Sequence, residues 1–174
     1  GPQTIIVRQV VGEKEKQKVL DIHVVVPDRK PSIEQIVDVF VKNVEVNSVD
    51  VITDKVIVRG EFEIKAIYVA CLPDQPVHAV EIKHYKWTQD IDIPGARRGM
   101  DADASVVVEF VDYDMNENSR GYKYKHYDHM NCDDEDDDDE CPPCPPSCEE
   151  EECDREFDVS VVLKITAKVL TDRE

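Results

Sequence analysis

Hydrophobic residues alternate with polar ones along most of this chain. The clearest alternating pairs are Val44 and Val46, Val49 and Val51, Val56 and Val58, and Phe62 and Ile64. A period of two is typical of strands that bury one face. Similar segments cover residues 66–71, 78–91, 105–113, 122–127 and 157–170. Near the N-terminus, residues 4–11 and 19–26 are dense in valine and isoleucine, so we expect two strands there, joined by a charged turn, GEKEKQK.

One segment has a helical pattern. Ser32 and Gln35 form a capping-box pair, which is typical of a helix N-terminus. The hydrophobic residues that follow have the i, i+3, i+4, i+7 spacing of a buried helical face, at Ile33, Ile36, Val37 and Phe40. The pattern therefore predicts one short helix at about residues 32–42.

The composition favours β-structure for the rest of the chain. Valine and isoleucine far outnumber leucine and alanine, and β-branched residues are enriched in strands. We therefore expect a mainly β protein: a single antiparallel β-sandwich-like domain over residues 1–174, with one short helix and a long hairpin insert.

The insert, residues 132–153, reads CDDEDDDDECPPCPPSCEEEEC and contains no aliphatic residue. Such a segment cannot bury a core. It interrupts a predicted hairpin between a tyrosine-rich strand that ends near Tyr127 and a last strand that begins near Phe157.

Charge limits the choice of partners. The chain has 39 acidic and 21 basic residues and a formal net charge of −18. Nucleic acids and anionic membranes need a basic surface, so neither is an expected partner. No hydrophobic run approaches the roughly 18 residues of a membrane helix, and the opening GPQTIIVRQV has no signal-peptide pattern. We expect a chain without a membrane span that is leaderless as given.

Several segments resemble a known family. The segments are VIVRGEFEIKAIYVA (56–70), His78, IDIPGARRGMDAD (91–103) and a closing valine-rich strand, preceded by VVGEKEKQKVL (10–20) and PSIEQIVDVFV (31–41). Together they resemble the SPOCS domain. The resemblance implies an assembly domain of the kind found in coat and envelope proteins of endospore-forming bacteria, and a location at the spore surface or outside the cell.

No catalytic constellation is evident. The chain has no G-x-S-x-G elbow, P-loop, dinucleotide fingerprint or H-E-x-x-H motif, so we predict no enzyme and no catalytic residue. His126, His129 and Cys132 follow one another at gaps of three, but they could share a metal only at a turn, because a regular strand would point the two histidines to opposite sides.

The cysteines are disulfide candidates: Cys71, Cys132, Cys141, Cys144, Cys148 and Cys153. A loop without a core needs covalent cross-links, and five cysteines in the insert leave one to remain free, to pair with Cys71 or to reach another subunit. Zinc is the alternative, although a second C-x-x-C pair is missing. Redox catalysis is disfavoured because the prolines around Cys141 and Cys144 oppose the helix that such a motif needs.

The acidic run is a candidate Ca²⁺ site, because clustered carboxylates are the ligands that Ca²⁺ prefers. Its residues are Asp133, Asp134, Asp136, Asp137, Asp138, Asp139 and Glu140. The alternative is a solvated, self-repelling loop. No cofactor is certain: Ca²⁺ is the first candidate metal and Zn²⁺ the second.

Two hypotheses about function remain. The first is a self-assembling structural protein of a spore or cell-surface layer or an extracellular fibre, with itself and other envelope proteins as partners. It polymerises by donating a terminal strand, with assembly residues Ile5, Ile6, Val7, Val10 and Val11, and with disulfides as a second link. The same strand could instead pair within its own domain. The second hypothesis is a monomeric cation-binding module that uses the insert.

Overall fold

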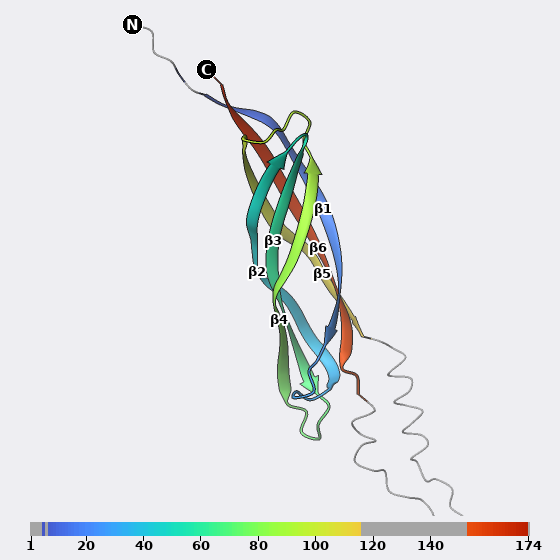
Figure 1. The fold of residues 1–174 in the computed structure, drawn as a ribbon. Coiled ribbons are helices and arrows are strands. Elements are labelled where there is room, and N and C mark those ends of the chain that lie inside the picture. Colours follow the sequence, from blue (N-terminus) through green and yellow to red (C-terminus); the bar gives the residue numbers. More distant parts are fainter. Residues whose placement is uncertain (1–4, 6, 116–152, 174) are drawn as a thin grey trace, which may run out of the picture.

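In the computed structural model the chain forms two three-stranded antiparallel sheets that pack face to face (Figure 1). The structure describes residues 5, 7–115 and 153–173. One sheet has the strand order β1-β6-β5 and the other β2-β3-β4. The strands are β1 (Val7–Val25), β2 (Ile33–Ile52), β3 (Lys55–Ala70), β4 (Val77–Asp92), β5 (Asp101–Met115) and β6 (Glu156–Arg173). The predicted mainly β, antiparallel sandwich is confirmed.

The core lies between the two central strands, β6 and β3. Every second residue of β6 from Phe157 to Val169 is buried, and so is every second residue of β3 from Val56 to Ala70. Each central strand thus presents one continuous apolar face to the opposite sheet. Tyr68, a fully buried side chain of the core, also donates its hydroxyl to the carbonyl of Pro31 at 2.8 Å, so its polar end is satisfied.

The predicted turn at residues 12–18 is wrong, because β1 runs through this segment and pairs with β6. Lys14 and Lys16 stand opposite Ala167 and Ile165, yet both lysines are exposed. An edge strand such as β1 tolerates charge, because long side chains reach water past its open side. Pairing with a complete apolar strand therefore outweighs the polar composition of this segment.

The predicted helix at residues 32–42 is also wrong: the segment is the first half of β2. Its pairing with β3 shifts twice, between Ile33 and Gln35 and again between Ile36 and Asp38. Each β-bulge adds one residue, so the buried positions fall at Ile33, Ile36 and Val39. This spacing of three imitates a helical face.

The strands that flank the segment holding the insert, β5 and β6, pair with each other. Met115 at the end of β5 stands opposite Phe157 at the start of β6, and β6 begins within one residue of the predicted position. The predicted strand at residues 122–127 lies outside the described residues.

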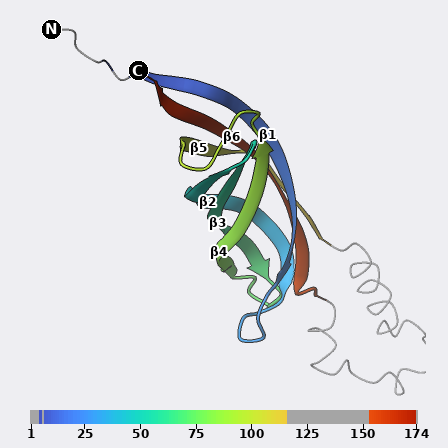
Figure 2. The ribbon, with the colours of Figure 1, turned by 45° about the horizontal axis from the view of Figure 1, so that its top comes forward.

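The elongated body has two distinct ends (Figures 1 and 2). At one end β1 begins and β6 ends, next to the β2–β3 turn and the connection between β4 and β5; we call it the terminal end. At the opposite end β5 ends and β6 begins, next to the β1–β2 and β3–β4 connections; we call it the insert end. The two ends are separated by the full length of the strands.

The bulged register of β2 can be tested with two neighbouring valines. Val39 is 7% exposed and Val37 is 53% exposed. We expect Val39→Ala to lower the free energy of unfolding by about 2 kcal/mol, since it leaves a cavity in the core. Val37→Ala should cost under about 0.5 kcal/mol. Urea unfolding measures both. If Val37→Ala lowered the free energy of unfolding more than Val39→Ala, the result would favour the helix at residues 32–42 over the bulged strand.

Candidate functional site

The first and last strands project beyond the rest of their sheet. Leu170 is paired on both sides, with Val10 of β1 and Asp101 at the start of β5. After Leu170, residues 171–173 pair only with residues 7–9 of β1. We call residues 7–10 and 170–173 the terminal ribbon. Figure 1 shows β1 and β6 continuing together past the other strands.

A bulge fixes the point where the ribbon leaves the body. The β1–β6 register shifts between Val10 and Gly12. A Cβ atom on Gly12 would lie 2.7 Å from Cγ2 of Ile93, so only glycine fits this close approach. Val11, the extra residue, packs against the core. The connection between β4 and β5 therefore contacts β1 closely at Gly12. Residues 7–10 lie beyond this contact, outside the body of the sandwich.

Arg8 ties the ribbon to β5. Its Nη2 lies 2.6 Å from a carboxylate oxygen of Asp101, and its Nε lies 3.5 Å from Asp172. All three side chains are about half exposed or more, so these ion pairs orient the ribbon more than they stabilise it.

The predicted assembly residues meet at this ribbon. Ile5, Val7 and Val10 are 69%, 57% and 48% exposed, whereas Val11 is partly buried. Val7 and Val10 pair with Arg173 and Leu170 of the same chain, which is the pairing that the sequence left open. Ile6 lies outside the described residues.

At the insert end, a disulfide joins the two sheets. Cys71 follows β3, Cys153 precedes β6, and their sulfur atoms are bonded. Hydrogen bonds reinforce this link: Ile33 N donates to Asp154 O at 2.8 Å, and Cys71 N donates to Ser32 O at 3.0 Å. One Arg155 nitrogen donates to both Pro27 O and Lys30 O. Three connections of the fold are thereby held together where the insert meets the body.

This disulfide pairs the only cysteine outside the insert with one from the insert, within one chain. The other candidates, Cys132, Cys141, Cys144 and Cys148, lie outside the described residues, as do His126, His129 and the acidic residues 133–140. Among the residues that the structure describes, no three histidine, cysteine or acidic side chains are placed to hold a metal ion.

A second polar region, which the sequence did not reveal, lies on the outer face of the sheet β2-β3-β4. Both strands that flank β3 bulge opposite residues 61–63. Asn43 on β2 and His84 on β4 have positive φ angles of 54° and 60°. Asn43 donates to Glu63 at 2.9 Å, and Nδ1 of His84 lies 2.6 Å from Glu61. The bulges therefore aim two side chains at the carboxylates of the central strand.

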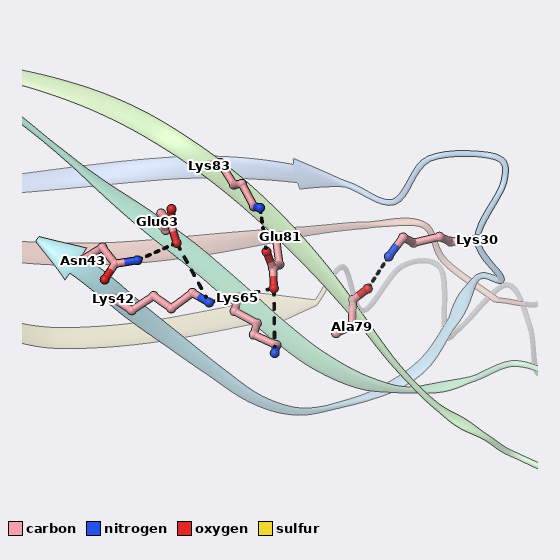
Figure 3. Close-up of polar contacts among 8 residues, drawn as sticks. All are labelled: Lys30, Lys42, Asn43, Glu63, Lys65, Ala79, Glu81 and Lys83. Atoms are coloured by element: carbon pink, nitrogen blue, oxygen red, sulfur yellow. Dashed lines mark hydrogen bonds and ion pairs between the residues drawn. The ribbon is translucent and has the colours of Figure 1, made fainter.

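Lysines complete this polar region (Figure 3). Lys42 lies 3.9 Å from both Glu63 and Glu81, and Lys65 lies 3.7 Å from Glu81. Each carboxylate thus has a cationic or hydrogen-bonding neighbour. Such a surface stabilises the register of three strands. The signal in the sequence was VKNVEVN, where Asn43 interrupts the alternation.

Comparison with known proteins finds one family model that matches part of the chain. Residues 32–116 match the family model described as SipL, SPOCS domain, which confirms the predicted resemblance. The match covers a little under half of the chain, from the start of β2 to the end of β5. No curated protein and no solved structure matches significantly. The described residues include no helix that is long and apolar enough to cross a membrane.

The disulfide can be tested by Cys71→Ser. We expect a loss of about 2–4 kcal/mol in the free energy of unfolding, because the bond closes a long loop. Wild-type protein with reductant should lose at least as much. Non-reducing gels should show the same bands for both proteins, because the bond between Cys71 and Cys153 lies within one chain. Unchanged stability in the variant would show that the cross-link does not form.

The contact between Glu61 and His84 predicts a pH dependence. The hydrogen bond with His84, and secondarily that with Asn47, lowers the pKa of Glu61. A lowered folded-state pKa contributes stability above the unfolded-state value near 4.5, and this stability is lost as the pH falls through the folded-state pKa. The difference in unfolding free energy between wild type and Glu61→Gln should therefore shrink from pH 6 to pH 3 in urea titrations. A constant difference would contradict this.

Proposed function

We propose that this protein is a structural, non-catalytic building block of a spore or cell-surface layer or fibre, which assembles with copies of itself through the terminal ribbon. The observation that carries the proposal is the ribbon itself: two strands that extend beyond the sheet and expose Val7 and Val10. The family match to a sporulation domain supports the setting.

The ribbon offers a partner both a sheet edge and exposed apolar side chains. A two-stranded ribbon is marginally stable in water, and it becomes stable when a further strand or a packed face covers it. Within the described residues β1 pairs with β6 alone, so its other side is a sheet edge. Such an edge accepts or donates a strand, and alternate side chains set the register.

The intrachain disulfide changes the expected covalent link. Cys71 and Cys153 are joined within one chain, so a cross-link between subunits in this proposal must use Cys132, Cys141, Cys144 or Cys148. Those four are an even number, which internal disulfides could consume entirely. Assembly in this proposal therefore depends on the ribbon, and covalent bonds are a reinforcement.

The alternative function is a monomeric cation-binding module built on the acidic insert. It rests on the composition of residues 133–140 alone. Size measurement in the presence of Ca²⁺, and again in the presence of a chelator, separates the two functions, since a cation-binding monomer changes shape without forming polymers.

Most of the β1 half of the ribbon can be removed without touching the core. Because Val11 packs against the core and Gly12 fits against Ile93, we expect deletion of residues 1–9 to abolish polymers while circular dichroism and thermal melting still show a cooperatively folded protein. Val7→Lys should have the same effect on polymers. Light scattering and negative-stain microscopy measure assembly.

Val37→Lys is the matched control, because Val37 is similarly exposed but lies on β2. It should leave polymers intact. Polymers that survive the deletion would remove the ribbon from the proposal, and a wild-type protein that stays monomeric at high concentration would remove self-assembly altogether.

A further inference from the structure

The outer face of the sheet β1-β6-β5 carries apolar side chains where polar ones are expected. Val162 on β6 stands directly opposite Val19 on one side and Phe110 on the other. Val19 and Phe110 are 62% and 57% exposed, and Val107 on β5 is 50% exposed. We call these four residues the apolar row. A solvent-facing sheet surface is normally polar, and a contiguous exposed apolar patch marks an interaction surface.

The side of the apolar row that faces the insert end is acidic. The next residues across the three strands are Asp21, Ser160 and Asp112, and the following ones are His23, Asp158 and Asp114. Asp21, Asp112, Asp114 and Asp158 line a shallow hollow of about 220 Å³. His23 stands opposite Asp158, and its Nδ1 lies 2.8 Å from a carboxylate oxygen of that residue. An occupant of this face must therefore combine apolar surface with positive charge.

A surface with this combination lies at the terminal end of the same chain. Arg97 and Arg98 are adjacent and exposed in the connection between β4 and β5. Neither guanidinium has a hydrogen bond or ion pair with any part of the chain that the structure describes. The same connection holds β1 at Gly12, so the two arginines share an end of the molecule with the exposed side chains of Val7 and Val10.

We infer that the apolar row and its acidic border receive the terminal end of a second copy of this chain. The inference rests on the proposed self-assembly and specifies its second contact. Two acidic faces would repel each other, so the contact pairs different surfaces. The arginines meet the carboxylates of Asp112 and Asp114, and the valines of the ribbon cover Phe110 and Val19.

This contact has a consequence for the shape of the assembly. The donor valines, Val7 and Val10, lie at the start of β1, whereas the acceptor residues Val19 and Asp21 lie in the second half of the same strand, so a chain cannot satisfy its own acceptor. A head-to-tail contact between different surfaces continues from copy to copy and produces an open, polar filament unless its rotation closes a ring.

Charge reversal tests the pairing directly in the full-length chain. We expect Arg97→Glu with Arg98→Glu to weaken association about 100-fold, because glutamates then face aspartates. Asp112→Arg with Asp114→Arg should weaken it equally, because arginines then face arginines. A mixture of the two variants should polymerise like wild type, since every contact in it again joins opposite charges. Sedimentation velocity and negative-stain microscopy measure the association of each variant and of the mixture.

The matched control reverses two exposed cations away from the terminal end, Arg29→Glu with Lys86→Glu, and it changes the net charge by the same amount. It should polymerise like wild type. Phe110→Ala should weaken association about tenfold, whereas Val77→Ala, on the other sheet, should not.

The outcomes separate this inference from the proposal beneath it. Restored polymers in the mixture support the pairing. If polymers persist in both charge-reversed variants but disappear on deletion of residues 1–9, the apolar row and its acidic border are not the acceptor. The role of the ribbon in assembly then still stands. Variants that lose polymers and are not restored by mixing overturn the pairing as well. A monomeric wild type removes both.

Discussion

The pairing of the first strand with the last is the interaction on which the rest of this structure depends. β6 lies between β1 and β5, and its buried residues from Phe157 to Val169 line the core on the side of its sheet. The sheet β1-β6-β5 therefore exists only when the whole chain is present, because its strands come from both ends of the sequence. The same pairing brings the two termini together at one end, where they extend into the ribbon.

β-Bulges determine where the terminal ribbon leaves the body and where polar side chains gather on the sheet β2-β3-β4. The bulge at Val11 separates the ribbon from the body, and the bulges beside Asn43 and His84 aim polar groups at Glu61 and Glu63. A bulge adds one residue to one strand, twists that strand and redirects its side chains. In each case the core on the other face of the sheet continues undisturbed, because the central strands keep their alternation.

The two ends of the body have different chemistry. At the insert end, the Cys71–Cys153 disulfide and Arg155 hold three connections together, and carboxylates border the apolar row. At the terminal end, the ribbon exposes valines beside two exposed arginines. The body has a direction along its length, and a building block with such a direction is suited to adding copies one after another.

The alternation of valine and isoleucine with polar residues determined, without any structure, that the protein is mainly β, and the composition of residues 132–153 set an acidic, cysteine-rich segment apart from it. The order of apolar residues is enough for this, because a strand buries every second side chain. Two local patterns led to wrong predictions. The first looks helical, because two bulges space the buried residues of β2 by three; its residues are Ile33, Ile36, Val37 and Phe40. The second, the charged segment 12–18, looks like a turn because an edge strand can carry charged side chains. Only the tertiary structure decided these cases, as well as the pairing of Cys71 with Cys153 and the alignment of Val19, Val162 and Phe110. Each depends on which distant segments become neighbours, and a strand's own residues do not encode its partner.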